Sequence, residues 1–111
     1  MLGAIIGDTI GSRFEFNNHR SKDFELFTKD NELTDDSIMT LAVADILLNN
    51  KINDPDAIID TLKEWGTLYP YAGYGWMFRQ WLFSSNRKPY KSFGNGSAMR
   101  VAPIAVCATS I

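Results

Sequence analysis

Apolar residues recur along this chain at the spacing of an α-helix, and no stretch shows the alternation of apolar and polar residues typical of a half-buried strand. The clearest stretch starts at Thr34, a good N-cap together with Asp35, and stops at the Asn49-Asn50 pair. The sequence therefore predicts an all-α fold, a helical bundle. The apolar residues of this stretch are Ile38, Met39, Ala42, Val43 and Ile46.

Two further helices are predicted from their boundaries. Asp54-Pro55 combines an N-cap residue with proline at the first helical position, and we expect this helix to end at Gly66. The next helix is expected after Gly75. The apolar faces are Ile58, Ile59, Leu62 and Trp65 in the first helix and Met77, Phe78, Trp81 and Leu82 in the second.

The last predicted helix begins near Ser97 and has to bend or restart at Pro103, because proline lacks a backbone donor and clashes with the preceding turn. The residues from Ala105 to Ile111 are apolar and include no capping glycine. We therefore expect a helix that continues to the last residue of the chain.

With 111 residues the chain has room for one hydrophobic core. Eleven Lys and Arg against thirteen Asp and Glu give a net charge of −2 with no block of like charge, so nucleic acid is not an expected partner. No apolar run approaches the roughly 20 residues that span a bilayer. The single cysteine, Cys107, cannot form an internal disulfide, which agrees with a reducing compartment. From the apolar runs and the cysteine together we expect a cytoplasmic protein without membrane contact.

Gly3, Gly7 and Gly11 recur every four residues in a stretch that otherwise suits a helix. Each glycine costs a helix interior about 1 kcal/mol relative to alanine, so three on one face indicate a close approach to the backbone. The simpler interpretation is a neighbouring helix packed tightly against that face. The alternative adds a ligand-facing loop over residues 12–16.

Thr34-Asp35-Asp36-Ser37 places two adjacent carboxylates between hydroxyl groups at a predicted helix start. Oxygen ligands of this kind suit Mg²⁺, Mn²⁺ or Ca²⁺. Side chains one residue apart point about 100° apart on a helix, but at its N-terminus we expect both carboxylates to reach one cavity. The tetrapeptide alone favours the ordinary alternative, in which these residues only cap the helix and complement its dipole.

A glycine-flanked turn precedes the last predicted helix, with a basic residue one turn further on. Exposed backbone N–H groups and a nearby arginine at such a helix start form a seat for a phosphate group. The alternative is that the glycines only shape a turn and the arginine lies across an aromatic surface. The residues concerned are Gly94, Asn95, Gly96, Ser97, Met99 and Arg100.

In combination, these motifs resemble the ADP-ribosylglycohydrolase family, which includes the dinitrogenase-reductase-activating glycohydrolases. The resemblance runs through nearly the whole chain, in the family's order and spacing. It rests on residues 3–12, Phe14-Glu15-Phe16, residues 34–40, Tyr74-Gly75 and residues 92–100.

The resemblance implies an all-α protein that binds two divalent ions, usually Mg²⁺ or Mn²⁺. The family's Thr-Asp-Asp metal motif matches Thr34, Asp35 and Asp36, and the two carboxylates are also implied to be catalytic. Glu15 matches a glutamate that a mobile loop carries near the substrate ribose in some members, which implies a catalytic role. Residues 94–100 match the segment that lines the ADP-ribose cleft.

The family's second metal motif, Asp-x-Asp-Thr/Ser near the C-terminus, has no match in this chain. Asp54-Pro55-Asp56 has part of that form, but Ala57 follows it and the predicted cap accounts for it. We therefore expect residues 1–111 to be the N-terminal part of an ADP-ribosylglycohydrolase-like domain. Apolar faces left uncovered would then favour self-association.

The implied reaction is hydrolysis at C1″ of an ADP-ribosyl group carried by a protein side chain or a smaller acceptor, with the metal ions holding the ribose hydroxyls and polarising a water. With half of the metal site missing, we expect these 111 residues alone to be inactive. Two alternatives stay open. The first is a non-catalytic descendant of the family, either an ADP-ribose-binding module or a structural protein. The second is a plain helical interaction domain whose acids only cap a helix.

Overall fold

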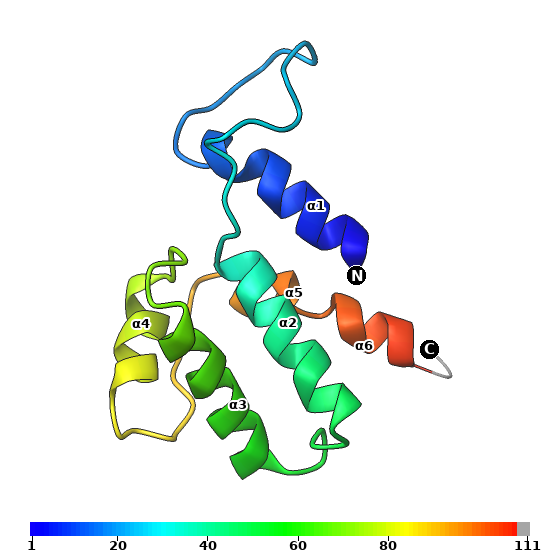
Figure 1. The fold of residues 1–111 in the computed structure, drawn as a ribbon. Helices are drawn as coiled ribbons and strands as arrows, with labels where there is room; N and C mark the ends of the chain where they lie inside the picture. The colour runs from blue at the N-terminus through cyan, green and yellow to red at the C-terminus, as the bar shows by residue number, and fades with distance from the viewer. Residues whose placement is uncertain (109–111) are drawn as a thin grey trace.

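The computed structural model describes residues 1–108. Within that range every regular element is helical, which confirms the predicted all-α fold (Figure 1). A 3-10 turn over Ser12–Phe14 follows the first helix. The α-helices are α1 (Leu2–Gly11), α2 (Asp35–Leu48), α3 (Pro55–Leu68), α4 (Trp76–Phe83), α5 (Gly96–Met99) and α6 (Ala102–Cys107).

α2 is the central helix and contacts α1, α3, α5 and α6 (Figure 1). Thr34 is its N-cap, as predicted: its backbone is extended, and the backbone N–H of Asp36 donates to its Oγ1 at 3.3 Å. Because helices pack on several sides of α2, burial is not limited to one stripe. The buried residues are Ser37, Ile38, Met39, Thr40, Ala42, Val43, Ala44 and Ile46.

α3 begins where the sequence predicts. The Asp54 carboxylate accepts hydrogen bonds from the backbone N–H groups of Asp56 and Ala57 at 3.1 and 3.2 Å, and Pro55 takes the first helical position. The capping interpretation of the Asp-Pro-Asp segment is therefore confirmed.

α3 ends later than predicted, because Gly66 lies inside the helix, which continues to Leu68. A Cβ on Gly66 would stand 2.5 Å from Cδ2 of Leu82. The glycine thus lets α4 approach α3 closely and does not stop the helix. The core between α2, α3 and α4 consists of Ile38, Met39, Ala42, Tyr74, Trp81 and Leu82.

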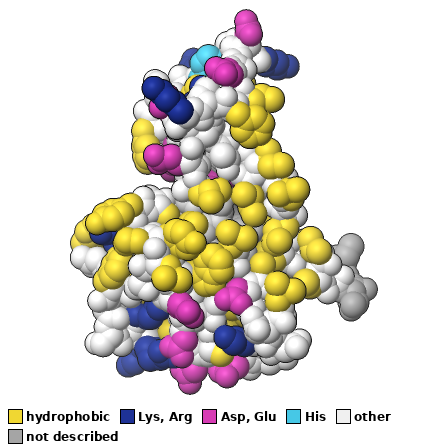
Figure 2. Space-filling model, in the orientation of Figure 1, with side chains coloured by type: hydrophobic (Ala, Val, Ile, Leu, Met, Phe, Trp, Pro, Cys, Tyr) yellow, Lys and Arg dark blue, Asp and Glu magenta, His cyan; other side chains and the backbone are white. Residues whose placement is uncertain are grey.

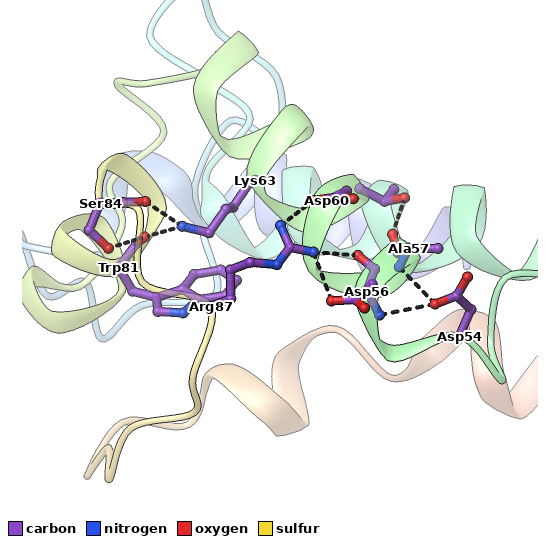
Figure 3. Close-up of polar contacts among 9 residues, drawn as sticks. Asp54, Asp56, Ala57, Asp60, Lys63, Trp81, Ser84 and Arg87 are labelled. Carbon is purple, nitrogen blue, oxygen red and sulfur yellow. Dashed lines mark hydrogen bonds and ion pairs between the residues drawn. The ribbon is translucent and has the colours of Figure 1, made fainter.

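Polar contacts tie α3 to the segment that leaves α4 (Figure 3). Lys63 on α3 donates from Nζ to the carbonyl oxygens of Trp81 and Ser84, both at 2.7 Å. Further along the segment, Arg87 forms an ion pair with Asp60 of α3 at 2.5 Å. Exposed ion pairs contribute only about 0–1 kcal/mol. These contacts therefore fix the path of the chain toward α5 more than they stabilise the fold.

The chain restarts a helix at Pro103, as predicted. α6 begins at Ala102 with Pro103 in its first turn, where a missing N–H leaves no helical hydrogen bond unmade. α6 ends at Cys107 and Ala108 is extended, so the expected continuation of this helix is wrong at the last described residue. The rest of that expectation, residues 109–111, lies outside the described residues. No helix among residues 1–108 is long and apolar enough to cross a membrane.

α1 leaves its glycine face open. None of its residues is buried, and nothing lies within 4 Å of a Cβ built on Gly3, Gly7 or Gly11. The interpretation that a neighbouring helix packs tightly against these glycines is therefore wrong within the described residues. Leu2 on α1 is 69% exposed. Hydrophobic side chains are spread over much of the face of the molecule that Figure 2 shows. Self-association through such surfaces stays a prediction.

Candidate functional site

A carboxylate of α1 holds the first turn of α2. Asp8 accepts three hydrogen bonds: from the backbone N–H of Thr34 at 3.0 Å, from Thr34 Oγ1 at 2.6 Å and from Ser37 Oγ at 2.6 Å. Both partners are buried, so little water competes for these bonds. α1 therefore fixes the helix start that carries Asp35 and Asp36.

The turn before α4 anchors Asp35 from another side. The backbone N–H of Asp35 donates to the carbonyl oxygen of Ala72 at 2.7 Å. Gly73 next to it adopts a φ of +93°, which favours glycine. Tyr74 follows, and its buried hydroxyl has no hydrogen-bond partner among the described residues. Burial first, and then the charge of Asp35, raises the pKa of Tyr74 to about 12, so the hydroxyl stays a protonated donor.

Asp35 lines a cavity of about 290 Å³ together with the glycine turn, Gly94 to Gly96, and Arg100. The first acid of the metal-type motif and the predicted phosphate seat are thus brought to one place, although about 60 residues separate them in the sequence. Four aromatic side chains also line this cavity: Trp76, Phe78, Tyr90 and Phe93.

Asp36 lines a second cavity, of about 530 Å³, whose wall is the glycine face of α1 with Asp8 and Glu15. Asn95 and Met99 border both cavities. The expectation that Asp35 and Asp36 reach one cavity is therefore wrong: successive side chains of α2 point about 100° apart, and the two acids enter neighbouring cavities.

Ser97 is the one predicted substrate residue that lines neither the cavity of Asp35 nor that of Asp36. It borders a mainly apolar cavity of about 600 Å³, which Gly94, Gly96 and Arg100 also border. The glycine turn therefore has a polar side toward Asp35 and an apolar side that includes Ile104 of α6.

The charged forms of the two acids at the start of α2 are disfavoured by their surroundings. Burial, then the charges of Asp36, Glu15 and Asp8, raises the pKa of Asp35 from 3.8 to about 6. Burial and Asp8 also raise the pKa of Asp36, against a lowering effect of Arg100. No ion pair of the described residues involves either acid. Such a cluster of uncompensated carboxylates favours a bound cation.

Arg100 is the basic residue whose charge acts on these acids, since it lowers the pKa of Asp36. Its Nε donates a hydrogen bond to the carbonyl oxygen of Gly96, and its guanidinium lies 4.9 Å from the ring centroid of Phe78. Burial lowers the pKa of Arg100, while Tyr90 and Asp35 act in the opposite direction. The arginine is therefore held half-buried at the edge of the cavity, where an anionic ligand would gain from it.

A buried threonine links the glycine turn to α2. Thr40 Oγ1 lies 2.6 Å from the carbonyl oxygen of Asp36 and 3.3 Å from that of Met99, and its single proton serves these two acceptors. This contact sets the position of α5 against the helix that carries the acids.

The donor chemistry at the helix start fits a hard divalent cation, because Thr34, Asp35 and Asp36 offer only oxygen atoms. Across residues 1–108, however, no group of three or more His, Cys, Asp or Glu side chains is arranged to hold a metal ion. Thr34, Asp35 and Asp36 could therefore supply only part of a coordination sphere. Glu15 is exposed directly after the 3-10 turn, at the edge of the second cavity.

Sequence reasoning missed Asp8 and Thr40 as parts of this site. Both make contacts with residues far along the chain, and neither belongs to a run of polar residues. The one local signal was an acid at position 8 within an otherwise uncharged helical stretch.

A family model described as ADP-ribosylglycohydrolase matches residues 1–110. Comparisons with curated proteins and with solved structures find no match.

Proposed function

The chain belongs to the ADP-ribosylglycohydrolase family, and on that premise we propose that its site removes ADP-ribose from a modified protein or a smaller ADP-ribosylated acceptor through a divalent-metal site. One observation carries this proposal: Asp35 shares a cavity with Gly94 to Gly96 and Arg100. That arrangement sets a carboxylate able to hold a cation beside donors able to hold a diphosphate. A nucleotide sugar needs both in adjacent positions.

Thr34, Asp35 and Asp36 would hold the metal, Mg²⁺ or Mn²⁺, with two ions in a complete family site. A bound divalent ion supplies Lewis-acid polarisation and positive charge beside the ribose. Since these oxygens are only part of a coordination sphere among residues 1–108, we propose that the 111-residue chain binds ADP-ribose without turning over a substrate.

The diphosphate is proposed to lie against the backbone N–H of Gly96 and the guanidinium of Arg100, because the N–H of Gly94 already donates to Ser92 Oγ at 3.0 Å. An arginine and backbone amides together give short, charge-assisted hydrogen bonds to phosphate oxygens. Trp76 and Phe93, which are 71% and 103% exposed at the rim of the same cavity, would stack on the adenine ring.

The ribose that carries the leaving acceptor is proposed to lie where the two cavities meet, near Asn95 and Met99. Glu15 reaches this region from the second cavity and would accept a hydrogen bond from a ribose hydroxyl. Asp36, on the same side, would hold negative charge near the anomeric carbon as positive charge develops there.

Isothermal titration of the chain with ADP-ribose, with and without Mg²⁺, tests this function. We expect binding that strengthens with Mg²⁺ and that weakens when ADP replaces ADP-ribose, because ADP lacks the distal ribose. Binding that ignores Mg²⁺ would instead indicate a non-catalytic ADP-ribose module. Absence of binding would indicate a structural or interaction protein.

Release of ADP-ribose from an ADP-ribosylated protein separates binding from catalysis. We expect no release by the 111-residue chain at any Mg²⁺ or Mn²⁺ concentration. Metal-dependent release would show that the coordination sphere is more complete than the described residues indicate.

A further inference from the structure

Asp8 is the most heavily bonded carboxylate at the site, although it belongs to neither the metal-type motif nor the glycine turn. All three of its donors come from the start of α2: the backbone N–H and hydroxyl of Thr34, and the hydroxyl of Ser37. It lies on α1, 26 residues before Thr34, and is half-buried. No ion pair of the described residues involves Asp8, so hydroxyl and amide donors are its partners.

The bond to the Thr34 hydroxyl decides how that oxygen can act. A threonine hydroxyl has one proton and two lone pairs. The proton is donated to Asp8 Oδ1 at 2.6 Å, and the oxygen accepts from the backbone N–H of Asp36 at 3.3 Å. One lone pair is then left, and the hydroxyl faces any further partner as an acceptor and never as a donor.

A negatively charged acceptor also polarises the O–H bond, which makes the oxygen a better ligand for a cation. Partners of metal ligands act in this way elsewhere, by fixing the orientation of the ligand and raising its basicity. Ser37, 1% exposed, supplies a second hydroxyl to the same carboxylate and keeps it in this orientation.

We propose that Asp8 is a positioning residue that fixes the Thr34 hydroxyl as an acceptor toward a divalent cation at the start of α2. This inference rests on the proposed function, because it concerns the same metal site. Asp8 itself does not touch the cation; it acts through Thr34.

The test is a double-mutant cycle on the full chain with Mn²⁺ as the probe, using electron paramagnetic resonance to count free ions. Asp8→Asn keeps the size of the side chain but places an NH₂ group opposite one of the three donors. We expect it to weaken Mn²⁺ affinity roughly 10- to 100-fold, as loss of such partners does at other metal sites. Thr34→Val should produce a loss of the same order, and Thr34→Ser should retain most of the affinity.

The cycle separates an action through Thr34 from a general effect on the fold. In the Thr34→Val background, Asp8→Asn should change the affinity by less than about 2-fold, since the hydroxyl that it orients is gone. The matched control is Asp45→Asn, on the same helix but away from the site, which likewise places an NH₂ group opposite one of the donors of the carboxylate, Trp65 Nε1 or Asn49 Nδ2. It should lower the melting temperature and leave Mn²⁺ affinity unchanged.

Two results overturn the inference in different ways. If Asp8→Asn and Asp45→Asn affect Mn²⁺ affinity equally, or if the effects of Asp8→Asn and Thr34→Val multiply, Asp8 has no positioning role while the proposed function stands. If the wild-type chain binds neither Mn²⁺ nor ADP-ribose, the proposed function fails and the role of Asp8 fails with it.

Discussion

The Oδ1 atom of Asp35 lies 3.9 Å from the point where a Cβ on Gly73 would stand. The neighbouring peptide makes a direct bond, since the N–H of Asp35 donates to Ala72 at 2.7 Å. The turn that leads into α4 and the first residue of α2 therefore form one structural unit. A change in that turn should reach the carboxylate and the cavity it lines.

Gly73→Ala tests this coupling. Gly73 has a φ of +93°, a conformation that alanine adopts only with strain, so we expect the free energy of unfolding to fall by about 1–3 kcal/mol. Urea denaturation measures this loss, and titration with ADP-ribose should show weaker binding. Gly75→Ala is the control for stability alone, because Gly75 lines the same cavity: its φ is −56° and nothing lies within 4 Å of a built Cβ, so only the poorer N-cap should matter and the loss should stay below about 1 kcal/mol. Equal losses in the two variants would contradict the coupling.

The helix starts were predictable because they depend on neighbouring residues alone. Thr34 and Asp54 cap their helices through side-chain bonds to N–H groups two or three residues away. Gly66 misled the prediction because its role depends on Leu82 of the next helix, and only that contact explains a glycine inside α3. Local rules thus place the helices, while tertiary packing decides where some of them end.

The same division applies to the site. The residues of the metal-type motif and the glycine turn were found from the sequence, and the structure brings Asp35 and the turn to one cavity. The separation of Asp36 from Asp35 follows from the rotation of about 100° between successive helix residues, which directs the two acids to cavities that share Asn95 and Met99 as a border. Asp8 could not be found, because its partner Thr34 is 26 residues away and only the packing of α1 on α2 joins them.

The raised pKa of Asp35 predicts how stability depends on pH. The folded chain binds this proton more tightly than the unfolded chain, with a pKa of about 6 against 3.8. Between these values unfolding releases a proton, so stability falls as the pH rises from 3.8 to about 6 and then levels off. Thermal melts without divalent cations should show this decline. Asp35→Asn should reduce it, whereas Asp60→Asn, outside the site, should keep it.

Mg²⁺ bound at Asp35 should offset the loss of stability that occurs as the pH rises. A cation binds the ionised carboxylate, so Mg²⁺ competes with the proton at low pH and meets no competition above the raised pKa. We expect the same Mg²⁺ concentration to raise the melting temperature more at pH 7 than at pH 5. A shift that is equal at both values, or that persists in Asp35→Asn, would place the bound ion elsewhere.

Arg100→Lys tests the diphosphate seat. Lysine keeps the positive charge but loses the planar group that binds Gly96, packs over Phe78 and presents paired donors to a phosphate. We expect ADP-ribose affinity to fall by about 1.5–3 kcal/mol, the range for a charge-assisted hydrogen bond. Arg79→Lys is a matched control, because Arg79 also bonds a carbonyl, that of Pro70 at 2.6 Å, and is exposed. Equal losses of affinity in both variants would argue against the seat.

The open glycine face of α1 gives the last prediction. Gly7 is inside a helix with nothing within 4 Å of a built Cβ, so Gly7→Ala should raise the free energy of unfolding by about 1 kcal/mol, the helix preference of alanine over glycine. Gly66→Ala gains the same preference but forces a methyl group against Leu82, at a cost of about 1–3 kcal/mol. Its net effect should be neutral or destabilising.

The affinity for ADP-ribose should rank the two variants the other way round from stability, with the larger loss in Gly7→Ala. The methyl group of Gly7→Ala projects into the cavity that Asp36 and Glu15 also line, so it should weaken ADP-ribose binding while it stabilises the chain. Gly66→Ala lies at the α3–α4 contact and should leave the affinity unchanged in the folded fraction. Titration and urea denaturation of both variants decide this. A stabilised Gly7→Ala chain with unchanged affinity would show that the glycine face borders empty solvent rather than the ligand, and would remove the second cavity from the site.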